Sequence, residues 1–197
     1  MIICGVKHGI GAGDMADQGM RALTGVYARL RELHAADLDM LRAWWTEPAL
    51  AVLSGTIVRP GPDDPSVEMF RPWGDGSESA AGLGLESLTT GELVGHVTIQ
   101  GVGLAGVPSL AVVVGPWYLG QGYEIDALRL GARYGFRSMG LAQVEITVWA
   151  LEDESLASYH ELGFSEVRRD RDVAFHDGAW HHQVVMRLAG VARSPGA

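Results

Sequence analysis

The sequence lacks the hallmarks of several protein classes. Its single cysteine, Cys4, excludes an intramolecular disulfide framework. No apolar run reaches the roughly 18 residues that a membrane-spanning helix needs, and the first residues lack the basic region and long apolar stretch of a secretory signal. We therefore expect a cytoplasmic protein with no membrane partner.

Basic residues are also scarce. The chain has 15 Lys and Arg residues against 24 Asp and Glu residues, which gives a formal net charge of -9. This balance argues against a protein that binds nucleic-acid phosphates or an anionic membrane. A cationic or amine-bearing partner suits the charge better.

The length of 197 residues fits one domain with a sizeable core. The 27 glycines, in a chain that is 47% hydrophobic, indicate many tight turns rather than disorder. Both ends have little periodicity, so we expect a flexible leader over 1–25, a single domain over 26–189 and a flexible tail over 190–197. An upstream start site is an equally simple account of the leader.

Hydrophobic periodicity predicts a mixed, mainly antiparallel sheet with helices on its faces, an α/β (α+β) fold. The stretch 58–76 holds four prolines and several turn formers, which predicts a long loop and a candidate substrate-binding flap. The expected strands lie at 26–33, 81–88, 93–102, 109–115, 144–150, 164–176 and 180–188, and the expected helices at 34–45, 122–139 and 152–162.

The most informative segment joins an apolar strand to a helix through a glycine-rich loop, Tyr118-Leu119-Gly120-Gln121-Gly122-Tyr123. Glycines let the backbone approach an anion, and a helix N-terminus offers unpaired N–H groups with about half a unit of positive charge. Such a junction can hold a phosphate group, although glycines alone are also typical of a plain tight turn.

In this context the sequence resembles the GCN5-related N-acetyltransferases (GNAT), especially their ribosomal-protein N-acetyltransferase-like branch, over about 27–188. The resemblance rests on five ordered motifs, each matching a family signature. They are Trp44-Trp45-Thr46-Glu47-Pro48, Gly91-Glu92-Leu93-Val94-Gly95, Gly115-Pro116-Trp117-Tyr118 with the glycine loop and Ala127-Leu128, Tyr159 with Leu162-Gly163-Phe164, and Asp177-Gly178-Ala179-Trp180-His181.

The resemblance implies the GNAT fold, acetyl-CoA as co-substrate and direct attack of an amine within a ternary complex. It implies that the pantetheine arm pairs with a strand and that the pyrophosphate lies on the loop. Tyr159 would protonate the leaving thiolate, which suits a phenol of pKa about 10. The implied cofactor-binding residues are Val112, Val113, Val114, Leu119, Gly120, Gln121, Gly122, Tyr123, Glu124, Glu152 and Ser155.

Three of these residues depart from the family pattern. Leu119 stands in place of Arg or Gln, Glu124 in place of Gly or Ala, and Glu152 in place of Asn. Glu124 would either compete with pyrophosphate for the positive helix end or turn outward as a favourable first-turn acid. These departures motivate an alternative hypothesis, a divergent protein of the same fold that binds a ligand without catalysis or uses another donor such as an acyl carrier protein.

The general base is not given by the family pattern, because Ser109 stands where many members carry an acid. His96 is our candidate base, since imidazole titrates near neutrality, although a strand histidine without a catalytic role is the simpler interpretation. Glu86 and Glu145 are lesser candidates, and Glu145 also suits a structural position in its strand.

For the acceptor we expect a small-molecule amine or a peptide N-terminus. Trp73, in the proline-rich loop, and Trp117, beside the glycine loop, are the candidate substrate-binding residues, because loops carry specificity. Trp44 suits the core better. We expect no metal site, because adjacent His181 and His182 point to opposite faces of a strand. A homodimer is left open.

Overall fold

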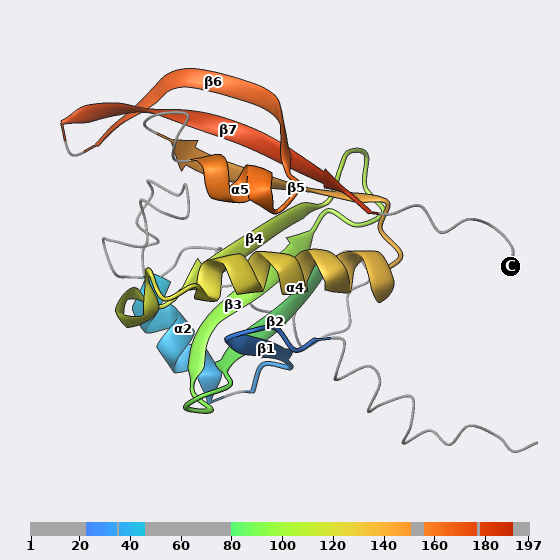
Figure 1. Ribbon diagram of the computed structural model, residues 1–197, viewed down its shortest axis with the longest axis vertical. Coiled ribbons are helices and arrows are strands. Elements are labelled where there is room, and N and C mark those ends of the chain that lie inside the picture. The colour runs from blue at the N-terminus through green and yellow to red at the C-terminus, as the bar shows by residue number, and fades with distance from the viewer. Residues whose placement is uncertain (1–22, 35, 46–79, 151–155, 177, 191–197) are drawn as a thin grey trace, which may run out of the picture.

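A computed structural model describes residues 23–34, 36–45, 80–150, 156–176 and 178–190 (Figure 1). Seven strands form one sheet in the order β1-β2-β3-β4-β5-β7-β6. The strands are β1 (Ala28–Arg31), β2 (Ala80–Ser87), β3 (Leu93–Gln100), β4 (Ser109–Val114), β5 (Gln143–Ala150), β6 (Ser165–His176) and β7 (Ala179–Ala189). The helices are α2 (Asp37–Trp45), α4 (Tyr123–Arg137) and α5 (Ala157–Glu161), with a 3-10 turn at Pro116–Tyr118.

Neighbouring strands run antiparallel throughout this sheet except for β4 and β5, which are parallel. The β2–β3 hairpin turns at Gly91, whose φ of 72° lies in the left-handed region that glycine adopts without strain. A register shift between Leu85 and Glu86 marks a bulge in this hairpin. The predicted fold class, a mixed and mainly antiparallel sheet, is confirmed.

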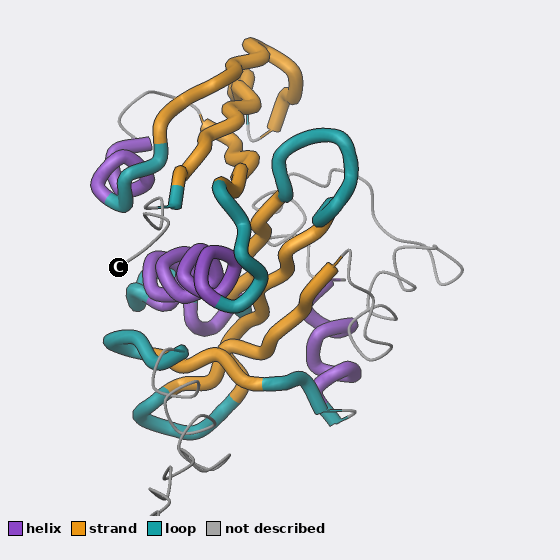
Figure 2. The backbone as a smooth tube through the Cα atoms, turned by 90° about the vertical axis from the view of Figure 1, so that its right-hand side faces the viewer, coloured by secondary structure: helices purple, strands orange, loops and turns teal. Residues whose placement is uncertain are grey.

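The long helix α4 and the short helix α2 cover opposite faces of the sheet, as Figure 2 shows. Gly131 allows helix α4 to lie close to the strands because it has no side chain. A Cβ at this position would lie only 2.7 Å from the side chains of Val97 and Leu110. On the other face, Leu41 and Trp44 of α2 form a separate buried cluster with Leu93 and Val113. Trp44 is 2% exposed, so the prediction that it belongs to the core is confirmed.

The predicted strands and helices lie where hydrophobic periodicity places them, with bounds that differ by a few residues. At the N-terminal side, Leu23 packs against the core, and its carbonyl accepts a hydrogen bond of 2.9 Å from the Leu30 N–H. The described residues therefore include the last three of the expected leader. Residues 1–22 and the expected flap over 58–76 lie outside the described residues.

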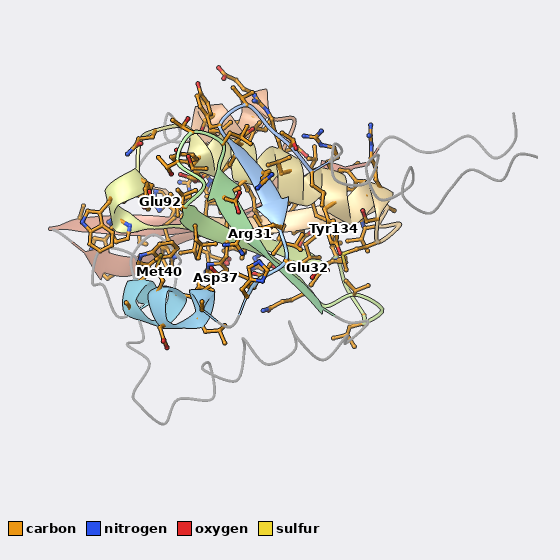
Figure 3. All side chains as sticks on the ribbon, turned by 90° about the horizontal axis from the view of Figure 1, so that it is seen from below. Arg31, Glu32, Asp37, Met40, Glu92 and Tyr134 are labelled. Carbon is orange, nitrogen blue, oxygen red and sulfur yellow. The ribbon has the colours of Figure 1, made fainter. Side chains whose placement is uncertain are left out.

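Charged side chains tie β1, β2 and α2 together on the α2 face (Figure 3). Arg31 donates two hydrogen bonds to Asp37 at the start of α2, at 2.7 and 2.9 Å. It also donates to Glu86 at 2.8 Å, and Arg29 donates to the same carboxylate. These bonds hold the first turn of α2 over the edge of the sheet. Within the described part of the chain, no helix has the length and apolar character needed to cross a membrane.

Candidate active site

The parallel strands β4 and β5 part soon after they meet. Among the described residues they share one register pair, Ser109 with Glu145, after which β4 stays with β3 and β5 stays with β7. Figure 1 shows the two halves of the sheet separating, with β5, β6 and β7 on one side and β1 to β4 on the other. The backbone of β4 beyond Ser109 thus faces a strand that has moved away.

The segment Val112, Val113 and Val114 occupies this free part of β4. Val113 and Val114 are buried at 8% and 5% exposure, and Val112 is half-buried. Their side chains belong to the core on both faces of the sheet. Any ligand contact from this segment on the β5 side therefore comes from its backbone.

The glycine loop follows directly and carries the chain from β4 into α4. Gly120 and Gly122 have φ values of 72° and 85°, in the left-handed region. Gly122 is the N-cap of α4, and no side chain caps this helix end. The first N–H groups of α4 therefore have neither an intrahelical acceptor nor a side-chain cap, which is the arrangement that binds anions.

Space around the loop differs between its two glycines. A Cβ at Gly120 would meet nothing within 4 Å, whereas a Cβ at Gly122 would lie 2.8 Å from the ring of Tyr27. Gly120 thus has an open side, and Gly122 is packed. Gln121 steadies the loop, since its side-chain amide donates to the Trp117 carbonyl at 2.9 Å.

A row of aromatic rings connects the two ends of the loop to neighbouring segments, and sequence reasoning did not anticipate it. Tyr27, Tyr123, Tyr118 and Trp44 meet edge to face, with successive ring centroids 6.4, 6.1 and 6.5 Å apart. Such contacts stabilise by about 0.5–1.5 kcal/mol each beyond burial. The sequence does not signal this row, because its members come from three separate segments: the chain before β1, helix α2, and the two ends of the glycine loop.

Asp126, in the first turn of α4, is a second residue that sequence reasoning missed. Its side chain is 2% exposed and accepts hydrogen bonds from the N–H groups of Tyr27 at 2.7 Å and Ala28 at 3.0 Å. A buried carboxylate needs such donors. Asp126 therefore fixes the start of β1 against the helix end that carries the loop.

The proposed acid Tyr159 lies on α5, half-buried, and its hydroxyl donates a hydrogen bond of 2.8 Å to Glu124 in the first turn of α4. Burial, followed by the negative charge of Glu124, raises the pKa of Tyr159 well above its ordinary value of 10. The structure thus brings together two predicted site residues that are 35 positions apart in the sequence. Glu124 points toward α5 rather than standing free at the helix end.

The candidate base His96 lies in the middle of β3, opposite Val113 of β4 and on the same face as α2. Its side chain is 2% exposed, and burial lowers its pKa to about 4. The imidazole is therefore neutral at physiological pH but only weakly basic in this setting. Its role as base stays a prediction.

The two lesser candidates for the base are both held in ion pairs. Glu86 accepts hydrogen bonds from Arg29 and Arg31. Glu145 accepts from Arg187 across β5 and β7, with nitrogen–oxygen distances of 2.9 and 2.5 Å. These arrangements give both carboxylates structural roles in the sheet.

The remaining predicted residues divide into exposed and undescribed ones. Trp117, next to the loop, is 71% exposed, and Leu119, within it, is 39% exposed. Glu152, Ser155 and Trp73 lie outside the described residues. His182 accepts a hydrogen bond of 3.1 Å from the Asp172 N–H, and no group of three potential metal ligands occurs in the part of the chain that the structure describes.

The protein-family model of the acetyltransferase (GNAT) domain matches this chain over residues 28–165. This span runs from β1 to the start of β6 and includes the loop, α4 and α5. A search of curated proteins finds no significant match.

Solved structures match the fold over most of its length. A spermidine N-acetyltransferase from Vibrio cholerae, in complex with CoA and spermine, has a TM-score of 0.70 at 16% identity and covers 83% of this chain and 95% of its own. A GNAT-family acetyltransferase from Bacillus anthracis has a TM-score of 0.64 at 15% identity, with coverages of 85% and 97%. A Vibrio cholerae protein provisionally assigned as a ribosomal-protein-serine acetyltransferase has a TM-score of 0.57 at 21% identity, with coverages of 85% and 97%.

Proposed function

The chain belongs to the GNAT acetyltransferase family, and we propose that it transfers an acetyl group from acetyl-CoA to a primary amine of a small molecule or a peptide N-terminus, in the cytoplasm. The observation that carries this proposal is the uncapped start of α4, which follows two left-handed glycines at the point where β4 and β5 part.

The backbone of this region fits the donor. The free N–H groups from Gly120 to Glu124 can bind the two negatively charged phosphates of the donor, and the open side of Gly120 leaves room for them. An extended amide-containing arm is suited to the backbone of Val112 to Val114, which β5 does not pair. The loop itself offers no cationic side chain, so backbone groups supply the donor contacts in this proposal.

Acetyl-CoA supplies an acetyl group activated as a thioester. For transfer, the attacking amine must be uncharged and the departing sulfur must gain a proton or a positive neighbour. We assign the second task to Tyr159, and the support is that its hydroxyl reaches the first turn of α4 from α5, which follows β5. The hydroxyl would give its proton to the departing sulfur and recover one from solvent.

Removal of the amine proton is the less defined step. His96 is our proposed base, because its neutral imidazole can accept a proton. While the imidazole is buried, its pKa of about 4 makes this transfer unfavourable. A pH profile of the His96→Gln variant that matches the wild type would remove His96 from the mechanism.

The acceptor proposal rests on charge. A net charge of -9 favours a cationic amine over an acidic substrate. The Vibrio cholerae neighbour of similar fold was solved with spermine, a polyamine, and that is a reason to include polyamines among the first acceptors tested. Exposed Trp117 is our candidate for contact with the acceptor, and a cation over its ring would gain about 0.5–1 kcal/mol.

The test is a screen of acceptors with acetyl-CoA, read by thiol release. The panel should contain spermidine, spermine, monoamines and peptides with a free N-terminal amine. We expect release above the no-acceptor background with at least one class of amine. Release that no amine stimulates, under conditions where CoA binds, would show that the donor site is coupled to another reaction.

A second candidate function is supported by Glu124, whose carboxylate lies in the first turn of α4 where the donor phosphates are expected. In this alternative the protein keeps the fold but binds another donor, such as an acyl carrier protein, or binds a ligand without catalysis. Calorimetric titration with CoA separates the two, because the alternative predicts no binding near millimolar concentration.

A further inference from the structure

A side-chain hydrogen bond spans the opening between the two halves of the sheet. The Tyr159 hydroxyl donates to Glu124 Oε1 at 2.8 Å. Glu124 is the second residue of α4, which follows β4, and Tyr159 lies on α5, which follows β5. The bond therefore joins the elements that come directly after the two strands that part.

This position places the bond across the path of the proposed donor. That path runs from the free backbone of β4 to the glycine loop, and Glu124 stands at the loop end while Tyr159 reaches over from the other half. The bond thus connects the two halves where the arm of the donor is expected.

We propose that the bond between Glu124 and Tyr159 is a strap that closes the donor path in the free protein and that the donor must displace. This inference rests on the proposed function, since it concerns the same site. It makes Glu124 a positioning residue that acts through Tyr159 and sets the affinity for the donor.

Charge supports this interpretation. The first turn of α4 already holds two acids, Glu124 and Asp126, and no basic side chain of the loop offsets them. Asp126 accepts hydrogen bonds from the N–H groups of Tyr27 and Ala28, so displacing it would break two bonds. Glu124 is exposed and accepts a hydrogen bond from the Tyr159 hydroxyl, so it is the acid that donor phosphates would push away.

Hydrogen-bond capacity supports it as well. A tyrosine hydroxyl has one hydrogen to donate, so Tyr159 cannot serve Glu124 and a departing sulfur at the same time. Opening the strap would therefore free the path and release the proposed acid in one step. It would also remove the nearby negative charge that helps to hold the Tyr159 proton.

The strap has an unusual consequence for variants. Glu124→Ala should bind CoA more tightly than the wild type, on the order of tenfold, because the donor no longer breaks a hydrogen bond to a charged group. Tyr159→Phe should also bind CoA more tightly, yet turn over more slowly because the acid is gone. Glu161→Ala, which removes an exposed acid on α5 outside the strap, is the matched control and should bind CoA as the wild type does.

The first measurement is calorimetric titration of the four full-length proteins with CoA, together with their kcat and KM for acetyl-CoA. Tighter binding in both strap variants supports the strap. Equal affinity in wild type and Glu124→Ala overturns it. Tighter binding in Glu124→Ala alone also overturns it, since that result assigns the effect to charge at the helix end rather than to the bond.

The second measurement needs no ligand and separates the strap from the proposed function. If no protein of the set binds CoA, the donor assignment fails, and amide hydrogen exchange of α5 still decides the strap. We expect α5 amides to exchange several-fold faster in Glu124→Ala and Tyr159→Phe than in wild type and Glu161→Ala. Identical exchange in all four proteins would contradict the strap.

Discussion

At the residue scale, the chemistry of the account depends on the Tyr159 hydroxyl. We expect Tyr159→Phe to lower kcat by roughly 10²-fold or more, as loss of a positioned general acid does. Donor binding should not weaken. Steady-state thiol release checks the rate, and Tyr134→Phe, which alters a half-buried tyrosine on α4, is the control. Unchanged turnover in Tyr159→Phe would exclude it as the acid.

His96 gives a second prediction at this scale, because burial lowers its pKa from 6.5 to about 4. As pH falls below 6.5 the unfolded chain takes up this proton and the folded chain does not. The contribution of neutral His96 to the free energy of unfolding is therefore fully present above pH 6.5 and declines as the pH falls to about 4. Below that pH this contribution changes no further. Each pKa unit corresponds to about 1.4 kcal/mol, so the loss is on the order of 3 kcal/mol.

Urea unfolding between pH 7 and pH 4 measures this effect. His96→Gln should show a shallower decline of unfolding free energy than the wild type over the same interval. The comparison uses the slopes, because a buried glutamine changes the absolute stability as well. Parallel slopes would mean that His96 is protonated in the folded protein.

Asp126 supplies the third prediction, on stability. In Asp126→Asn the amide replaces a carboxylate that accepts two buried N–H groups. Hydrogen bonds to charged groups contribute about 1.5–3 kcal/mol each, so the unfolding free energy should fall by on the order of 3 kcal/mol. Glu32→Gln, at an exposed position, should change it by less than about 0.5 kcal/mol. Similar stability for both variants would deny the anchoring role.

At the element scale, the start of α4 depends on two glycines with different surroundings. Alanine at Gly120 meets only the strain of a left-handed backbone, about 1–2 kcal/mol, because the space around it is open. Alanine at Gly122 meets the same strain and also the Tyr27 ring, 2.8 Å from the new Cβ. We expect Gly122→Ala to lower the melting temperature clearly more than Gly120→Ala. Equal losses would indicate that the Tyr27 ring moves aside freely.

Most elements could be predicted because each depends on local sequence. Apolar residues at alternate positions indicate strands, and the three-to-four spacing of Leu38, Leu41 and Trp44 indicates the helix α2. The left-handed glycines, Gly120 and Gly122, follow from residue type and context. Bounds shifted by a few residues because helix and strand ends depend on packing that the sequence does not display.

The candidate site was harder to predict because it is assembled from distant segments. The contact between Glu124 and Tyr159 joins residues on different helices, and the bonds of Asp126 reach back nearly a hundred positions to β1. The sequence left two interpretations of Glu124 open, and neither includes its hydrogen bond to Tyr159, which depends on how α5 lies beside α4. The burial of His96 likewise depends on the cover that α2 and the neighbouring strands give to β3.

At the scale of the whole molecule, the fold consists of two halves joined where Ser109 meets Glu145. The half containing β1 to β4 carries the anion-binding helix end, and the half containing β5 to β7 carries Tyr159. A donor held along the free edge of β4 would contact both. We therefore expect the donor to contact one continuous surface that runs from β4 to the first turn of α4.

The most direct test of this claim is a titration of the ¹⁵N-labelled full chain with CoA, followed by assigned amide resonances. We expect the largest shifts at Val112 to Val114 and at Gly120 to Glu124, with a further change in α5 as Tyr159 leaves Glu124. Shifts confined to other parts of the sheet, or no shifts at millimolar CoA, would contradict it.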